Sequence, residues 1–135
     1  MTKKNFQAPN STSKIEVCDA FSDTEKHLIC VKKLKGSATL SHLFAQGSVS
    51  LSLLADYDKY QEFFCKKTNS HFGTKKYSSK TLKVTDYKVV YAISSGRKGS
   101  LTKLVPFFSK VNLLTHAKAI KTRGAKIALY KIEES

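Results

Sequence analysis

The stretch KIEVCDAFSDTEKHLICVKK, residues 14–33, decides the fold of this chain because apolar and polar residues alternate in it twice. Alternation with a period of two is typical of a β-strand that buries one face. It predicts strands over Ser13–Asp19 and His27–Leu34. Between them, Phe21–Lys26 holds serine, aspartate and threonine, which favour a turn. The folded part of the chain is therefore expected to open with a β-hairpin.

Polar groups gather on one face of this hairpin. If the turn centres near Thr24, Glu16 lies opposite Lys32 on the neighbouring strand. By the same register Cys18 lies opposite Cys30. Because side chains alternate across a strand, these four share one face, and the neighbouring isoleucines and valines occupy the other. An acid and a lysine are thus expected side by side.

This arrangement resembles the hairpin of restriction-endonuclease-like nucleases, which carry an acid on one strand and acid-x-Lys on the next. In such enzymes carboxylates hold a divalent ion that activates water, and the lysine stabilises developing negative charge. The resemblance implies catalytic roles for Glu16, Asp19 and Lys32, with Glu16 as metal ligand and Mg²⁺ or Mn²⁺ as the cofactor. Here Cys30 stands in place of the second acid, and a thiol is a poor ligand for Mg²⁺.

Three interpretations of the hairpin stay open. It can be a metal-dependent nuclease site, although alternation points Asp19 away from Glu16. It can be a degenerate nuclease fold retained for binding, in which case no cofactor is expected. The plain alternative is a cross-strand ion pair between Glu16 and Lys32 in a structural hairpin.

Beyond the hairpin the apolar period changes to that of helices and then alternates with strands. Helices are expected over 38–46, ending at Gly47, over 50–66, and from about Pro106 or Ser109 to Arg123. Strands are expected over 87–94 and 125–133, and residues 66–86 form a long basic loop. Residues 1–13 are expected to be a flexible lead and residues 14–135 a single α/β domain. Its mixed β-sheet is flanked by helices in the order β-β-α-α-β-α-β, of restriction-endonuclease-like type.

The net charge of +14, from 24 basic and 10 acidic residues, favours a polyanionic partner. Clustered lysines contact phosphates without reading sequence, so nucleic acid is the expected partner, DNA before RNA. His42 and Gln46 are expected on one face of the first helix beside the hairpin. The residues expected to bind nucleic acid are Lys33, Lys35, His42, Gln46, Lys66, Lys67, Lys75, Lys76, Arg97 and Lys98.

Three segments resemble a known family when taken together: IEVCD, LICVKK followed by SATLSHLFAQGSVS, and YKVVYAI followed by LVPFFSKVNLLTHAKAIKTRGAKIALYKI. They are similar to the C-terminal part of a sporadically distributed bacterial family of unknown function with an I-H-V-K and S-H-L-F-x-Q-G signature. The resemblance implies a defence or mobile-element setting and a chain shorter than most members. The histidine of the signature is Cys30 here.

Several classes of protein are disfavoured. No stretch reaches the ~20 apolar residues of a membrane span, and no apolar leader is visible, so no membrane contact and a cytoplasmic location are expected. Three cysteines without C-x-x-C spacing argue against a disulfide scaffold or zinc site. The sequence therefore predicts a basic, non-catalytic nucleic-acid-binding domain. A metal-dependent nuclease, and a protein-interaction subunit with a partner chain or homo-oligomer, are the alternatives.

Overall fold

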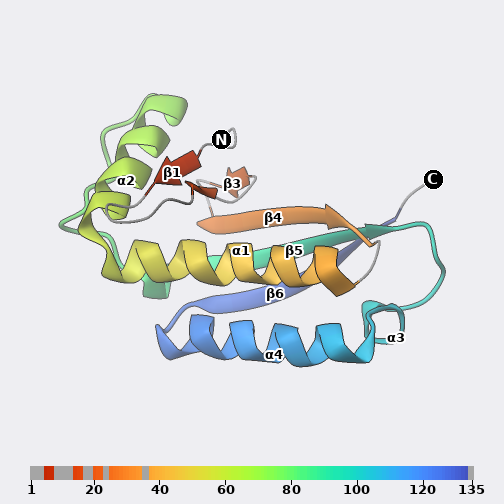
Figure 1. Ribbon diagram of the computed structural model, residues 1–135. Helices are drawn as coiled ribbons and strands as arrows, with labels where there is room; N and C mark the ends of the chain where they lie inside the picture. The colour runs from red at the N-terminus through yellow and green to blue at the C-terminus, as the bar shows by residue number, and fades with distance from the viewer. Residues whose placement is uncertain (1–4, 8–13, 17–19, 23–24, 35–36, 134–135) are drawn as a thin grey trace.

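A computed structural model describes residues 5–7, 14–16, 20–22, 25–34 and 37–133 of the chain. Its main element is a four-stranded sheet in the order β3-β4-β5-β6 (Figure 1). Its strands are β3 (Ala20–Ser22), β4 (His27–Lys33), β5 (Lys88–Ser95) and β6 (Lys126–Glu133). β3 runs antiparallel to β4, whereas β4, β5 and β6 are parallel, so the sheet is mixed. A separate two-stranded sheet pairs β1 (Asn5–Gln7) with β2 (Lys14–Glu16).

Helices make the connections between the parallel strands. α1 (Ser37–Asp56), α2 (Asp58–Phe72) and the short 3-10 turn η1 (Val84–Asp86) lead from β4 to β5. α3 (Leu101–Leu104) and α4 (Phe107–Thr122) lead from β5 to β6. α1 and α4 pack side by side on one face of the sheet, and α2 stands beside β3 at the end where β4 and β5 begin (Figure 1).

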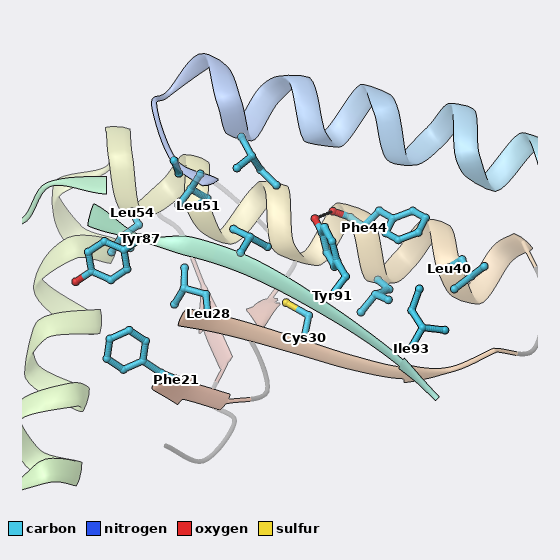
Figure 2. Close-up of a cluster of buried hydrophobic side chains, with 14 of the residues drawn as sticks. Phe21, Leu28, Cys30, Leu40, Phe44, Leu51, Leu54, Tyr87, Tyr91 and Ile93 are labelled. Carbon is cyan, nitrogen blue, oxygen red and sulfur yellow. Dashed lines mark hydrogen bonds between the residues drawn. The ribbon is translucent and has the colours of Figure 1, made fainter. Parts of the chain in front are cut away.

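The core lies between α1 and the sheet (Figure 2). The side chains of Leu28, Cys30 and Tyr91 point from the strands toward Leu40, Phe44 and other apolar residues of α1, and all of these are 0–2% exposed. Tyr91 donates a hydrogen bond from its hydroxyl to the carbonyl oxygen of Phe44 at 2.7 Å. Its ring meets that of Phe44 edge to face, with 5.2 Å between centroids. One buried strand position therefore fixes where α1 sits on the sheet.

The strand and helix predictions for the second half of the chain are confirmed. β5, α4 and β6 fall where the alternating and helical patterns placed them. These elements are long and their periods are clear, which is the case in which pattern is most informative. The chain is therefore an α/β protein with a mixed sheet and helices.

The predicted end of the first helix at Gly47 is wrong. α1 continues through Gly47 to Asp56, and the break comes at Tyr57, whose φ of −122° and ψ of 106° are extended. The side-chain amide of Gln61 on α2 donates from Nε2 to the carbonyl oxygens of Leu54 and Ala55, at 3.0 and 3.2 Å. Two carbonyls left unpaired by the end of α1 are satisfied in this way.

The predicted pairing of the hairpin is also wrong. Glu16 is the Cα partner of Asn5 in the small sheet, so it does not lie opposite Lys32. The strand that pairs antiparallel with β4 is β3, with Phe21 opposite Leu28. Phe21, which the sequence placed in the turn, lies in β3. Its ring is buried, and the ring centroid lies 5.3 Å from that of Phe64 and 6.0 Å from that of Tyr87. Of the expected lead, residues 5–7 form β1 and the others lie outside the described residues.

Candidate functional site

Of the residues predicted to form a nuclease site, the structure places Glu16 and Lys32 on strands of different sheets. The backbone of Glu16 belongs to β2, and Asp19 and Lys35 lie outside the described residues. Lys32 is the Cα partner of Ile93, near the end of β4. Among the described residues no group of three or more histidine, cysteine, aspartate or glutamate side chains could hold a metal ion. Catalysis with Mg²⁺ or Mn²⁺ stays a prediction.

Cys30, at the position of the missing acid, is a core residue. It is 0% exposed and lies beneath α1 with Leu28 (Figure 2). The expectation that Cys30 and Lys32 share a face fits the burial pattern of β4, because the opposite face carries Val31, which is 39% exposed. A carboxylate at position 30 would place a charge in the hydrophobic core, which is costly. An apolar thiol suits this position.

His42 and Gln46 lie on α1, but their surroundings differ. His42 is exposed, whereas Gln46 is buried at 9% exposure. Neither Nε2 nor Oε1 of Gln46 has a hydrogen-bond partner in the part of the chain that the structure describes. Gln46 is therefore not on a surface that phosphates could reach in this conformation.

The basic residues divide between two ends of the sheet. The carboxyl edge is the end at which the parallel strands finish, and it carries Lys33, Arg97 and Lys98. The Nζ atom of Lys131 donates there to the carbonyl oxygens of Arg97 and Gly99, at 2.7 and 2.9 Å. The amino edge is the end at which these strands begin, and α2 and the loop of residues 73–83 lie there with Lys66, Lys67, Lys75 and Lys76. The predicted set is thus two separate surfaces.

At the amino edge, three lysines surround a small hollow. Lys26, Lys76 and Lys83 line it together with Ser78 and Thr81, and its volume is about 150 Å³. Among the described residues that line it, Asp86 is the only acid, and its Oδ2 atom lies 3.9 Å from Nζ of Lys26. Three cations and one anion leave this hollow with a positive excess. Its volume and charge suit a phosphate group, and the Ser78 hydroxyl, which accepts from the Lys80 N–H at 3.3 Å, keeps its own proton to donate.

The side chain of Asn69 helps to hold the loop that carries this hollow on α2. Asn69 donates from Nδ2 to the carbonyl oxygen of Tyr77 at 2.9 Å and accepts from the Tyr77 N–H at 3.1 Å. The ring centroids of Tyr77 and Phe21 lie 6.1 Å apart, and Nζ of Lys76 lies 5.3 Å from the Tyr77 ring centroid. The lysines of the loop are therefore presented from an anchored segment.

Lys26 is a residue of this site that the sequence did not reveal. It follows the turn between β3 and β4 with a φ of +56°, and its carbonyl oxygen accepts from Lys88 N–H at 3.1 Å. This contact brings the turn beside the loop some 50 residues further along the chain. No local pattern carries that information, although a lysine in a polar turn is a weak signal.

A second polar contact joins α1 to α4. Nδ1 of His116 lies 3.0 Å from Oγ of Ser48, and burial lowers the pKa of the His116 imidazole below its ordinary value. About two turns further along both helices, Nε and Nη2 of Arg123 donate to Oδ2 of Asp56 at 3.0 and 2.7 Å. Burial also raises the pKa of the Cys65 thiol, which disfavours its thiolate. These groups serve packing, and none lines the hollow at the amino edge.

Fold and site together define a small α/β domain with lysines at both ends of a mixed sheet. The chain belongs to a family of unknown function (DUF6119), whose family model matches residues 1–133. No curated protein and no solved structure matches the chain. No described helix has the length and apolar character needed to cross a membrane. The defence or mobile-element setting stays a prediction.

Proposed function

We propose that this domain binds nucleic acid without cutting it, through phosphate contacts made by lysines at the amino edge of the sheet. The observation that carries the proposal is the hollow lined by Lys26, Lys76 and Lys83. A phosphate group in it would meet ammonium groups and hydroxyls. Such contacts supply affinity that does not depend on base sequence.

The surroundings of the hollow support a longer contact along a nucleic-acid backbone. Lys66, Lys75 and Lys80 are exposed on α2 and the loop beside it. Phe72, which ends α2, is 36% exposed and offers a ring for stacking on an unpaired base. The overall charge of +14 adds long-range attraction to any polyanion. DNA is proposed ahead of RNA as the nucleic acid bound, and the binding measurement compares the two.

A pair of charge-matched variants tests the proposal. Lys75→Gln, Lys76→Gln and Lys83→Gln together remove three exposed charges at the amino edge. Lys103→Gln, Lys118→Gln and Lys121→Gln together remove three exposed charges from α3 and α4.

The measurement is fluorescence anisotropy of labelled double- and single-stranded DNA and RNA across a salt series. For the wild-type protein, log Kd should rise linearly with log salt, with a slope of about 0.9 per phosphate neutralised on duplex DNA. The amino-edge variant should lower that slope by about 2–3 and weaken binding at least roughly tenfold at low salt. The α3–α4 variant should change the slope by less than about one. Equal effects of the two variants would show that only net charge matters.

The nuclease alternative is tested in the same reactions with Mn²⁺ added. Intact substrate fits the proposal. Cleavage that needs Mn²⁺ and is lost in both Glu16→Ala and Lys32→Ala would replace it, because both residues belong to the predicted catalytic set. The restriction-endonuclease-like type of the fold would gain support from the same result.

A further inference from the structure

The outer edge of β6 is open in the part of the chain that the structure describes. No described strand pairs with it on the side away from β5. The N–H of Lys126 donates to the carbonyl oxygen of Tyr87 at 3.1 Å. Because backbone groups alternate in direction along a strand, the N–H and C=O groups of Ile127, Leu129 and Lys131 point away from β5. This edge presents a row of alternating donors and acceptors.

Nothing in the centre of β6 blocks further pairing. Native edge strands are commonly protected by proline, by a bulge or by charged residues. Residues 127–130 are Ile-Ala-Leu-Tyr, with no charge and no proline, and all eight residues of β6 pair in register with β5. Leu129 is 40% exposed on the face that carries the helices, and Tyr130 is 55% exposed on the other. This centre is suited to accept another strand.

An apolar groove of about 610 Å³ runs beside the same edge, between α3, α4 and β6. Its apolar lining is formed by Leu101, Val105, Leu113, Leu114 and Leu129. Leu114 is 68% exposed, which is high for a leucine. It lies one helical turn after Val111, which is exposed too, so α4 presents apolar side chains to solvent here. A strand added to β6 would direct every second side chain toward this groove. Backbone pairing and apolar pockets are the two components of strand addition by a peptide.

The charges around the groove indicate the chemistry of the occupant. Lys110 lines it, and Lys118 and Lys121 continue along α4 beside Leu114. Lys131 lines it too, but its Nζ atom already donates to two backbone carbonyl oxygens and lies 3.1 Å from Oε1 of Glu133, so the charge argument rests on the lysines of α4. A second copy of this chain would bring these lysines against their own counterparts, which is unfavourable. Nucleic acid would place sugars and phosphates against exposed leucines and would leave the backbone groups of β6 unmatched. An acidic polypeptide satisfies the lysines, the leucines and the open strand edge together.

We propose that β6 and the groove beside it bind an extended acidic segment of another protein, which adds a fifth strand to the sheet. The segment carries apolar residues at its centre and carboxylates at both ends. This surface lies on the last strand and α4, away from the loop that carries the proposed nucleic-acid site. The two proposals can therefore fail independently.

Three labelled peptides test the proposal against the full chain. The first is Glu-Glu-Val-Leu-Val-Leu-Glu-Glu, the second has lysine in place of each glutamate, and the third is the acidic peptide with its four apolar residues N-methylated. We expect anisotropy to report binding of the first only. Amide hydrogen exchange of Leu129 and Lys131 should slow when the first peptide is present, because their N–H groups become bonded.

Two substitutions on α4 locate the site. Leu114→Glu places a charge in the groove and should weaken binding of the acidic peptide at least roughly tenfold. Phe108→Glu is the matched control, because Phe108 is 78% exposed on the same helix and does not line the groove. It should change the affinity by less than about threefold. Both side chains are exposed, so both variants are expected to fold.

Several results would overturn the proposal. Equal binding of the acidic and lysine peptides would remove the charge argument, and binding of the N-methylated peptide would remove strand addition. No binding up to about 1 mM acidic peptide would reject the site altogether. A Leu114-dependent dimer in light scattering would assign the surface to a second copy instead. Displacement of the peptide by an oligonucleotide from this groove would assign it to nucleic acid.

Discussion

Gly47 occupies the middle of α1 because of a contact with a residue 44 positions further along the chain. A Cβ built on Gly47 would lie 2.6 and 2.7 Å from Cε1 and Cζ of the Tyr91 ring. That ring is 0% exposed and is held by its hydrogen bond to Phe44. Glycine usually weakens a helix interior, and sequence reasoning therefore read this position as a helix end. The close approach of the helix to the sheet outweighs that preference.

Gly47→Ala should therefore destabilise the protein, although alanine is the better helix former. Overpacking against a buried ring costs about 3 kcal/mol, and the gain in helix propensity returns about 1 kcal/mol. The free energy of unfolding, measured by urea titration, should fall by about 2 kcal/mol. In a Tyr91→Leu background the same substitution should instead be stabilising by about 0.5–1 kcal/mol, because the obstructing ring is gone. Stabilisation in both backgrounds would contradict the contact.

His116 should make stability depend on pH. Burial lowers the pKa of its imidazole in the folded protein, while the unfolded chain titrates near the ordinary value of 6.5. As the pH falls below that value, the unfolded chain takes up the proton first, so the free energy of unfolding decreases. The contribution of His116 to the free energy of unfolding should be constant above about pH 7. Below that it should decline until the pH is lower than the pKa of this imidazole in the folded protein.

Urea titrations between pH 8 and pH 5 would measure this effect. His116→Gln should give a shallower decline than the wild-type protein, because the titrating group is removed. His42→Gln, which changes an exposed histidine on α1, should leave the decline unchanged. Identical profiles for all three proteins would exclude His116 as the source.

At the scale of elements, pattern located β5, α4 and β6 but not the partners of the shorter strands. A strand of three residues, such as β2 or β3, has too few positions to fix its register by alternation. Pairing of β3 with β4 is favoured by burial of Phe21 among Phe64 and Tyr87, which come from elsewhere in the chain. The proposed lysine site depends on the same kind of long-range contact, since Lys26 and Lys83 meet only after folding.

The loop of residues 73–83 should depend on Asn69 for its order. Asn69→Ala leaves both the N–H and the carbonyl of Tyr77 without their side-chain partner, at a cost of about 1–3 kcal/mol if neither is resolvated. Amide exchange of residues 74–82 should accelerate, while that of β5 stays slow. The affinity for nucleic acid should fall in the same variant, because Lys76 and Lys83 lose their fixed positions.

Asn69→Asp is the control for this prediction. It keeps the acceptor for the Tyr77 N–H and loses only the donor, so its effect on loop exchange should be smaller than that of Asn69→Ala. Equal acceleration in the two variants would mean that the donated bond alone holds the loop.

At the scale of the whole molecule, the charge of +14 should act on folding and on binding in opposite directions. Like charges repel in the compact state, so raising NaCl from about 20 to about 200 mM should increase the free energy of unfolding. The same change should weaken nucleic-acid binding, because counterion release contributes less.

The two triple lysine variants separate these effects. Both lower the net charge by three and should reduce the salt dependence of stability to a similar extent, whereas only Lys75→Gln, Lys76→Gln and Lys83→Gln should lower the salt slope of binding. Loss of binding in proportion to net charge, whichever lysines are removed, would mean that the charge acts as a whole and that the hollow at the amino edge is not a site.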